Sequence, residues 1–128
     1  SIAHDQYHKH SYYLLAHSNL PGFSREEQHA LAVMVRGQRR SFPKKYIKAL
    51  PLESQLLTQN LTILLRLAMV FNRGRSVDGE TPLTLAVTSK ELQLTLPKGW
   101  LAEHPLTEAD LLQEIRYLKD ASIKMSLE

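Results

Sequence analysis

The chain has 128 residues, of which 43% are apolar and 23% are charged, a composition that excludes a disordered chain of low hydrophobicity and is typical of one folding unit with a core. No apolar run approaches the ~20 residues of a membrane-spanning helix, and the lack of cysteine excludes disulfides and thiolate metal sites. The net charge is only +3, but nine basic residues and one acid lie between Arg36 and Arg75. That distribution favours a polyanionic partner.

The N-terminal half of the sequence is predicted to form helices. A first helix is expected over residues 5–18, which contain neither Gly nor Pro and in which apolar residues recur at helical spacing. It ends before Gly22. A second helix starts at Ser24, because Ser24 and Glu27 have the spacing of a capping box, and it ends at Gly37.

A third, longer helix gives the strongest periodic signal. Its apolar residues fall on one face, which we expect to form the centre of a helical core: Leu57, Leu61, Leu64, Leu65, Ala68 and Phe71. The helix is predicted to stop near Gly74. Between Pro43 and Pro51 the sequence leaves room for a short additional helix.

After Gly79 the pattern changes to alternation. Residues 83–88 and 92–96 are predicted to form a β-hairpin, and residues 123–127 a third strand. A last helix is expected from Thr107, where Asp110 completes a second capping box and Leu106 and Leu111 are spaced as a hydrophobic staple. The sequence thus predicts an α+β chain: three helices in residues 1–76, then β-β-α-β in residues 77–128, with a small antiparallel sheet carrying one helix on one face.

Histidines near the N-terminus allow one metal hypothesis. His4 and Asp5 form the dipeptide used by HD-type metal phosphohydrolases, and His8 lies one helical turn further on. Such a centre needs further ligands that the sequence does not supply at the right places. A free-standing HD-type enzyme therefore stays an alternative, and no metal ligand or catalytic residue is predicted within this chain.

The basic residues are the better candidates for a binding function, because guanidinium, ammonium and imidazole groups donate to phosphate oxygens. Arg66, inside an otherwise apolar stretch, strengthens this interpretation. An RNA-binding module is a further alternative, but aromatics are not interleaved with the basic run, which argues against nucleic acid as a partner. The predicted phosphate contacts are His8, Lys9, His10, Arg36, Arg39, Arg40, Lys44, Lys45, Lys48 and Arg73.

Five separated blocks carry a family resemblance. They are Tyr7-His8-Lys9-His10-Ser11, Leu20-Pro21-Gly22-Phe23-Ser24, Val35-Arg36-x-x-Arg39-Arg40, Leu64-Leu65-Arg66-Leu67-Ala68 and Trp100-Leu101-x-x-His104-Pro105-Leu106. In this order they resemble the C-terminal region of the exopolyphosphatase and guanosine pentaphosphate phosphohydrolase (Ppx/GppA) family. One departure is Gln38, which stands where the family often has His before the arginine pair.

The resemblance implies a division of labour. Residues 1–76 would be a degenerate HD-like lobe, while Mg²⁺ and the catalytic acid would belong to two actin-like lobes that precede this chain. This region would bind inorganic polyphosphate, contact those lobes and form a homodimer, all in the cytoplasm. With no initiator methionine and no signal peptide pattern, we expect an excised fragment that is inactive by itself. Guanosine pentaphosphate is the alternative substrate of the parent.

Overall fold

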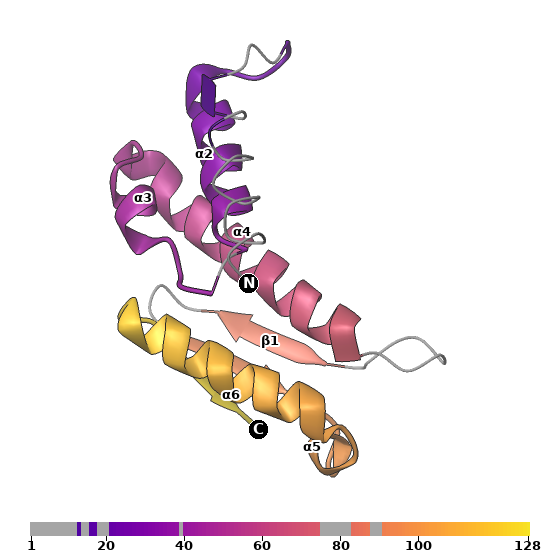
Figure 1. Cartoon of the computed structure of the whole chain (residues 1–128). Helices are drawn as coiled ribbons and strands as arrows, with labels where there is room; N and C mark the ends of the chain where they lie inside the picture. Colours follow the sequence, from indigo (N-terminus) through magenta and orange to yellow (C-terminus); the bar gives the residue numbers. More distant parts are fainter. Residues whose placement is uncertain (1–12, 14–15, 18–20, 39, 75–82, 88–90) are drawn as a thin grey trace. The chain divides into compact units, whose positions relative to one another are not determined.

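A computed structural model describes residues 13, 16–17, 21–38, 40–74, 83–87 and 91–128. They form helices and one small sheet (Figure 1), which confirms the predicted α+β class. The chain divides into two compact units, Ser1–Arg66 and Leu67–Glu128. The predicted lobe boundary after residue 76 falls outside the described residues and stays a prediction.

Helix α2, Arg25–Arg36, has the predicted capping box. The backbone N–H of Glu27 donates to Ser24 Oγ at 3.0 Å, and the backbone N–H of Ser24 donates to Glu27 Oε1 at 2.9 Å. This bond from the Ser24 N–H, followed by the bond with the Ser24 side chain, lowers the pKa of Glu27 from its ordinary value of 4.5. The start of α2 is therefore specified by local sequence.

The C-cap of α2 is Gly37, as predicted, but the reason is space rather than backbone freedom. Gly37 has φ −66°, which any residue adopts, and its N–H donates to Val33 O at 2.8 Å. A Cβ at this position would collide with Thr62 Cγ2 and lie 3.1 Å from Pro43 Cγ. The end of α2 thus approaches the helix that carries Thr62 too closely for a side chain.

Two more helices complete the first unit. The short predicted helix is α3, Lys44–Lys48, and the long one is α4, Leu52–Gly74, which also extends into the second unit. Of the first predicted helix, residues 13, 16 and 17 are helical, and the rest of 5–18 lies outside the described residues. No helix in the described part of the chain is long and apolar enough to cross a membrane.

The burial of α4 contradicts the sequence prediction. The expected core stripe is largely on the surface, with exposed fractions of 65% for Leu57, 37% for Leu61, and 46% for both Leu64 and Leu65. The buried residues of α4 in the first unit are Thr58, Thr62, Ile63 and Arg66. Periodicity identified residues that share a face, but the opposite face is the one that meets the end of α2 and the loop after it.

The second unit contains a three-stranded sheet in the order β1-β2-β3. Strands β1, Thr84–Val87, and β2, Glu91–Thr95, form the predicted antiparallel hairpin, whereas β3, Lys124–Leu127, pairs with β2 in parallel. The predicted fully antiparallel sheet is therefore wrong. Helices lie between β2 and β3 in the sequence, and such a crossover returns the chain to the end where the first strand began.

The connection between β2 and β3 holds two helices, α5, Trp100–Glu103, and α6, Pro105–Asp120. The predicted start at Thr107 is wrong because Pro105 occupies the first helical turn, where proline is favoured. Leu106 is 81% exposed, so it forms no staple. Trp100 is half-buried and stacks on His104 with ring centroids 3.8 Å apart.

Helix α6 packs beside β3 (Figure 1) and closes the core of the second unit. Its buried leucines, Leu111 and Leu118, are at most 1% exposed. The alternating strand residues supply the other side of this core: Leu92, Leu94, Leu96, Ile123 and Met125. Alternation therefore located the buried face of β2 and β3 correctly.

Candidate phosphate-binding site

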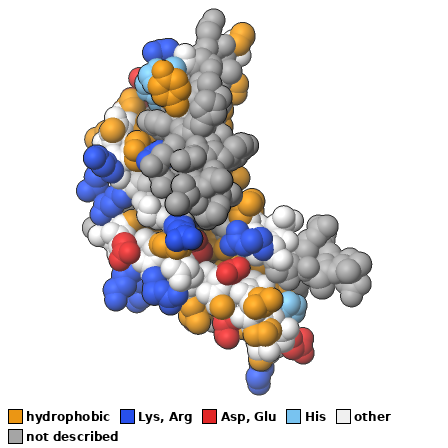
Figure 2. Space-filling model, viewed as in Figure 1, with side chains coloured by type: hydrophobic (Ala, Val, Ile, Leu, Met, Phe, Trp, Pro, Cys, Tyr) orange, Lys and Arg blue, Asp and Glu red, His pale blue; other side chains and the backbone are white. Residues whose placement is uncertain are grey.

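Part of the predicted basic run surrounds a small pocket in the first unit. We call residues 36–48, from the end of α2 to the end of α3, the basic loop. Its pocket measures about 170 Å³, and none of the described residues that line it is acidic. Lys and Arg side chains gather over α3 in Figure 2. The lining residues are Arg36, Ser41, Phe42, Pro43, Lys44, Lys45 and Tyr46.

Arg36 is positioned by an aromatic ring. Its Cζ lies 4.3 Å from the ring centroid of Tyr46, a cation–π distance. Arg36 stands in the last turn of α2 and Tyr46 in the middle of α3, so this contact ties the two helices together across the pocket. The contact with the Tyr46 ring orients the guanidinium of Arg36 at the wall of the pocket.

Buried Arg66 holds the backbone of the basic loop. This side chain is 4% exposed, and its Nη1 donates to Gly37 O at 2.7 Å while its Nη2 donates to Arg40 O at 2.8 Å. A longer contact of 3.4 Å joins Nη1 to Ser41 O. The guanidinium fork of Arg66 thereby satisfies loop carbonyls that have no helical partner. Its role in the structure is to fix the loop.

The remaining predicted contacts are spread over the chain. Arg40 and Lys48 are exposed and belong to the basic loop but do not line its pocket. Arg73 belongs to the second unit, where its Nε lies 3.6 Å from Asp110 Oδ2. His8, Lys9, His10 and Arg39 lie outside the described residues. The structure thus brings Arg36, Lys44 and Lys45 together, and the roles of the four residues outside the described ranges stay predictions.

Sequence reasoning missed the four uncharged residues that line the pocket, Ser41, Phe42, Pro43 and Tyr46. Their one signal was proximity in sequence to the basic residues. Tyr46 follows a Lys-Lys pair and stands ten positions after Arg36, so only the folded loop shows that the two side chains meet.

The described residues contain no cluster of side chains that could hold a metal ion. Within these ranges no three His, Asp or Glu side chains gather as a metal site would require. The candidate HD dipeptide, His4 and Asp5, lies in the part of the chain that the structure does not describe. The guanidinium, ammonium and hydroxyl donors that line the described pocket are suited to the binding of an anion.

Comparison with known proteins agrees with these features. The family model described as Ppx/GppA phosphatase, domain III, matches residues 1–115. A guanosine-5'-triphosphate,3'-diphosphate pyrophosphatase of Pseudoalteromonas translucida is 34% identical over 113 residues, covering 88% of this chain and 22% of that protein. Proteins of the same name from Photobacterium profundum and Vibrio cholerae are 34% and 35% identical over 123 residues, covering 94% of this chain and 24% of their own length.

The chain thus spans about a quarter of the length of these curated relatives. The family match includes nearly all of the described helices and the hairpin, and it contains the whole basic loop. The chain belongs to the Ppx/GppA phosphatase family and corresponds to its domain III.

Proposed function

We propose that this region binds the phosphate chain of the substrate of a parent phosphoanhydride hydrolase, and that the ligand is inorganic polyphosphate. The observation that carries the proposal is the pocket of the basic loop, where Arg36, Lys44 and Lys45 meet without an acidic neighbour among the described lining residues. Polyphosphate has about one negative charge per phosphate, so adjacent cations contact adjacent phosphates.

The contacts that hold the described residues of the loop in place support binding. Arg66 fixes the carbonyls of Gly37 and Arg40, and Tyr46 fixes the guanidinium of Arg36. A loop that is already ordered loses little conformational entropy when it binds a ligand. Arg40 and Lys48, exposed on the same loop, extend the cationic surface beyond the pocket for a ligand longer than one phosphate.

Catalysis belongs to the rest of the parent in this proposal. Mg²⁺ and the residues that activate the attacking water would lie in the preceding lobes, and the parent would work in the cytoplasm. The chain 1–128 alone is then inactive. Incubation with polyphosphate and Mg²⁺ should release no more phosphate than a variant with Arg36, Arg39 and Arg40 replaced by glutamate; release well above that control would contradict the proposal.

The binding test is fluorescence anisotropy with labelled long-chain polyphosphate at several salt concentrations. We expect the double variant Lys44→Gln/Lys45→Gln to weaken binding and to reduce the slope of log K against log [salt] by about 1.4, following the value of about 0.7 per contact for single-stranded polyanions. The matched control is Lys98→Gln/Arg116→Gln, which removes two exposed charges outside the loop.

Equal loss in the two double variants would show that only net charge matters and would overturn the assignment to the loop. Competition by structured RNA at equal charge, with base preference, would instead favour the RNA-binding alternative.

Guanosine pentaphosphate is the second candidate, and the names of the relatives favour it: the three described above are guanosine-5'-triphosphate,3'-diphosphate pyrophosphatases. The same pocket accommodates the phosphates of a nucleotide. The two candidates differ in the number of phosphates that they present, because a polymer contacts more cations outside the pocket than a short nucleotide does. Lys48→Gln, at an exposed cation outside the pocket, should therefore weaken polyphosphate binding more than nucleotide binding.

We also propose that this region mediates homodimerisation of the parent through α4. The support is the exposed leucine face, which we define as Leu57, Leu61, Leu64 and Leu65. Contiguous exposed apolar side chains of this kind are typical of interaction surfaces. Sedimentation velocity of the chain should show a concentration-dependent dimer, and a strictly monomeric chain at high micromolar concentration would contradict this part of the proposal.

A further inference from the structure

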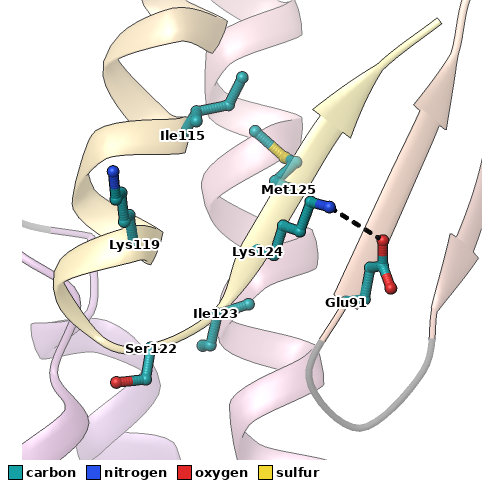
Figure 3. Close-up of a pocket in the computed structure, with 7 residues that line it drawn as sticks. All are labelled: Glu91, Ile115, Lys119, Ser122, Ile123, Lys124 and Met125. Carbon is teal, nitrogen blue, oxygen red and sulfur yellow. Dashed lines mark ion pairs between the residues drawn. The ribbon is translucent and has the colours of Figure 1, made fainter.

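The second unit contains a pocket that the proposed function does not use. It measures about 660 Å³, within the range of small-molecule sites. Residues from α6, from the turn after it, from β3 and from the start of β2 line it (Figure 3). We call it the β3 pocket.

The floor of the β3 pocket is apolar. Ile123 and Met125 are at most 4% exposed and share one face of the β3 segment, two residues apart. Ile115 faces them from α6, and in Figure 3 its side chain and that of Met125 point toward each other. The nearly buried Ile123 and Met125 thus close the bottom of the pocket, and the half-buried Ile115 offers aliphatic surface to the apolar part of a ligand.

The rim of the β3 pocket is cationic. Lys119 lies one helical turn after Ile115 and so lines the α6 wall, while Lys124 lines the strand wall. Lys124 Nζ lies 3.7 Å from Glu91 Oε1, with the two side chains 74% and 56% exposed. An ion pair this exposed is weak, so an incoming acid group competes for Lys124.

Ser122 contributes a hydroxyl from an unusual backbone position. It has φ 63°, in the left-handed region where glycine is preferred. The backbone explains the geometry: the N–H of Ile123 donates to Leu118 O at 2.8 Å and the N–H of Ser122 donates to Lys119 O at 2.9 Å, the two bonds of a Schellman motif. A polar side chain thus stands where glycine would be less strained, and it lines the pocket.

We propose that the β3 pocket binds a small amphipathic anion, an apolar body bearing one carboxylate or phosphate group. The apolar body contacts Ile115 and Met125, and the acid group accepts hydrogen bonds from Lys119, Ser122 and Lys124. Polyphosphate does not fit this description, because it has no apolar part to place on the floor. The inference is therefore independent of the ligand proposed for the basic loop.

The probes are octanoate, octyl phosphate and 1-octanol, titrated into the chain 1–128 and followed by the methyl NMR signals of isoleucine and methionine. We expect the two anions to shift the signals of Ile115, Ile123 and Met125, and 1-octanol to bind about five- to tenfold more weakly, as two or three partly exposed polar contacts allow. Comparison of octanoate with octyl phosphate shows which acid group the rim prefers. Equal affinity for octanol, or shifts confined to other methyl groups, would overturn the proposal.

Two variants isolate the rim. Lys119→Gln removes one exposed charge, and we expect two- to fivefold weaker octanoate binding. Ser122→Gly removes the hydroxyl and relieves the strained backbone, so we expect weaker octanoate binding together with a higher melting temperature. Octanoate affinity that is unchanged in both variants would contradict the assignment of the rim.

A crossed control separates this inference from the proposed function. Lys44→Gln/Lys45→Gln should leave octanoate binding intact while it weakens polyphosphate binding, and Lys119→Gln should do the reverse. Loss of octanoate binding in the Lys44/Lys45 variant would overturn the β3 pocket proposal. Unchanged polyphosphate binding in that same variant would contradict the basic loop and leave the β3 pocket standing.

Discussion

The two faces of α4 reverse the usual distribution of side chains. In the first unit, the inner face buries Thr58, Thr62 and Arg66 beside Ile63, and the outer leucine face is exposed. Buried polar groups are tolerated when they are hydrogen-bonded. Thr62 Oγ1 donates to Thr58 O at 2.7 Å, and Arg66 donates to loop carbonyls. The inner face thus holds the basic loop, while the leucine face is exposed.

The largest expected effect concerns Arg66 on the inner face. Arg66→Met keeps an aliphatic side chain but leaves the buried carbonyl of Gly37 and the partly buried carbonyl of Arg40 without their donor. We expect the free energy of unfolding to fall by about 3 kcal/mol, measured by urea denaturation followed by circular dichroism. A loss below about 1 kcal/mol would mean that the polar inner face does not hold the loop.

A second effect tests how closely the inner face approaches α2. Gly37→Ala introduces a Cβ against Thr62 Cγ2, and we expect a loss of about 2 kcal/mol from overpacking. Thr62→Ser removes that methyl group and keeps the hydroxyl that bonds to Thr58 O. The double variant should recover most of the loss, and failure to recover it would place the strain elsewhere.

Removal of the α2 cap provides a reference that touches neither face of α4. Ser24→Ala should lower the free energy of unfolding by about 1 kcal/mol, as an N-cap substitution does.

The second partner of the cap, Glu27, makes this stabilisation depend on pH. Because the pKa of Glu27 is lowered in the folded state, its contribution to stability is present above the ordinary pKa and is lost as the pH falls through the folded value. Urea denaturation at pH 7 and pH 3 should show that the difference between wild type and Glu27→Gln shrinks at pH 3.

The smallest effect on stability is expected at the leucine face. Leu57→Gln/Leu64→Gln should change the free energy of unfolding of the monomer by no more than about 0.5 kcal/mol per site, since the two side chains are 65% and 46% exposed. The same variant should shift the self-association constant measured by sedimentation. The control is Leu112→Gln, a leucine of the second unit that is 45% exposed. Large destabilisation at the leucine face would show that it is a core surface after all.

Prediction from sequence succeeded where the signal is local. The capping box of Ser24 and Glu27 needs only residues three positions apart, and the alternation in β2 reports burial of Leu92 and Leu94 directly. Prediction from sequence failed where the burial of a helix face or the pairing of a strand depends on a segment distant in sequence. The periodicity of the leucine face is the same whether that face is buried or exposed. No local feature of the β3 sequence indicates that β3 pairs in parallel with β2.

The candidate site was predictable only in part for the same reason. Charge density indicated the basic loop and named Arg36, Lys44 and Lys45, which the structure does bring to one pocket. From the sequence, Arg66 was interpreted as a further cation of the basic run. Charge alone does not distinguish a surface cation that contacts a ligand from a buried donor to loop carbonyls. Neither the contact of Tyr46 with Arg36 nor the β3 pocket had a signal in the sequence, since both arise from segments that meet only in the fold.

The position of β1 affects how the chain behaves at high concentration. Strand β1 is at the edge of the sheet, its residues are uncharged, and Leu83 and Val87 beside and within it are 40% and 42% exposed. An uncharged, exposed edge strand recruits strands from other molecules, which leads to sheet extension and aggregation. Ala86 is exposed in the middle of this edge. A lysine at that one position is therefore expected to keep concentrated samples soluble without disturbing either core.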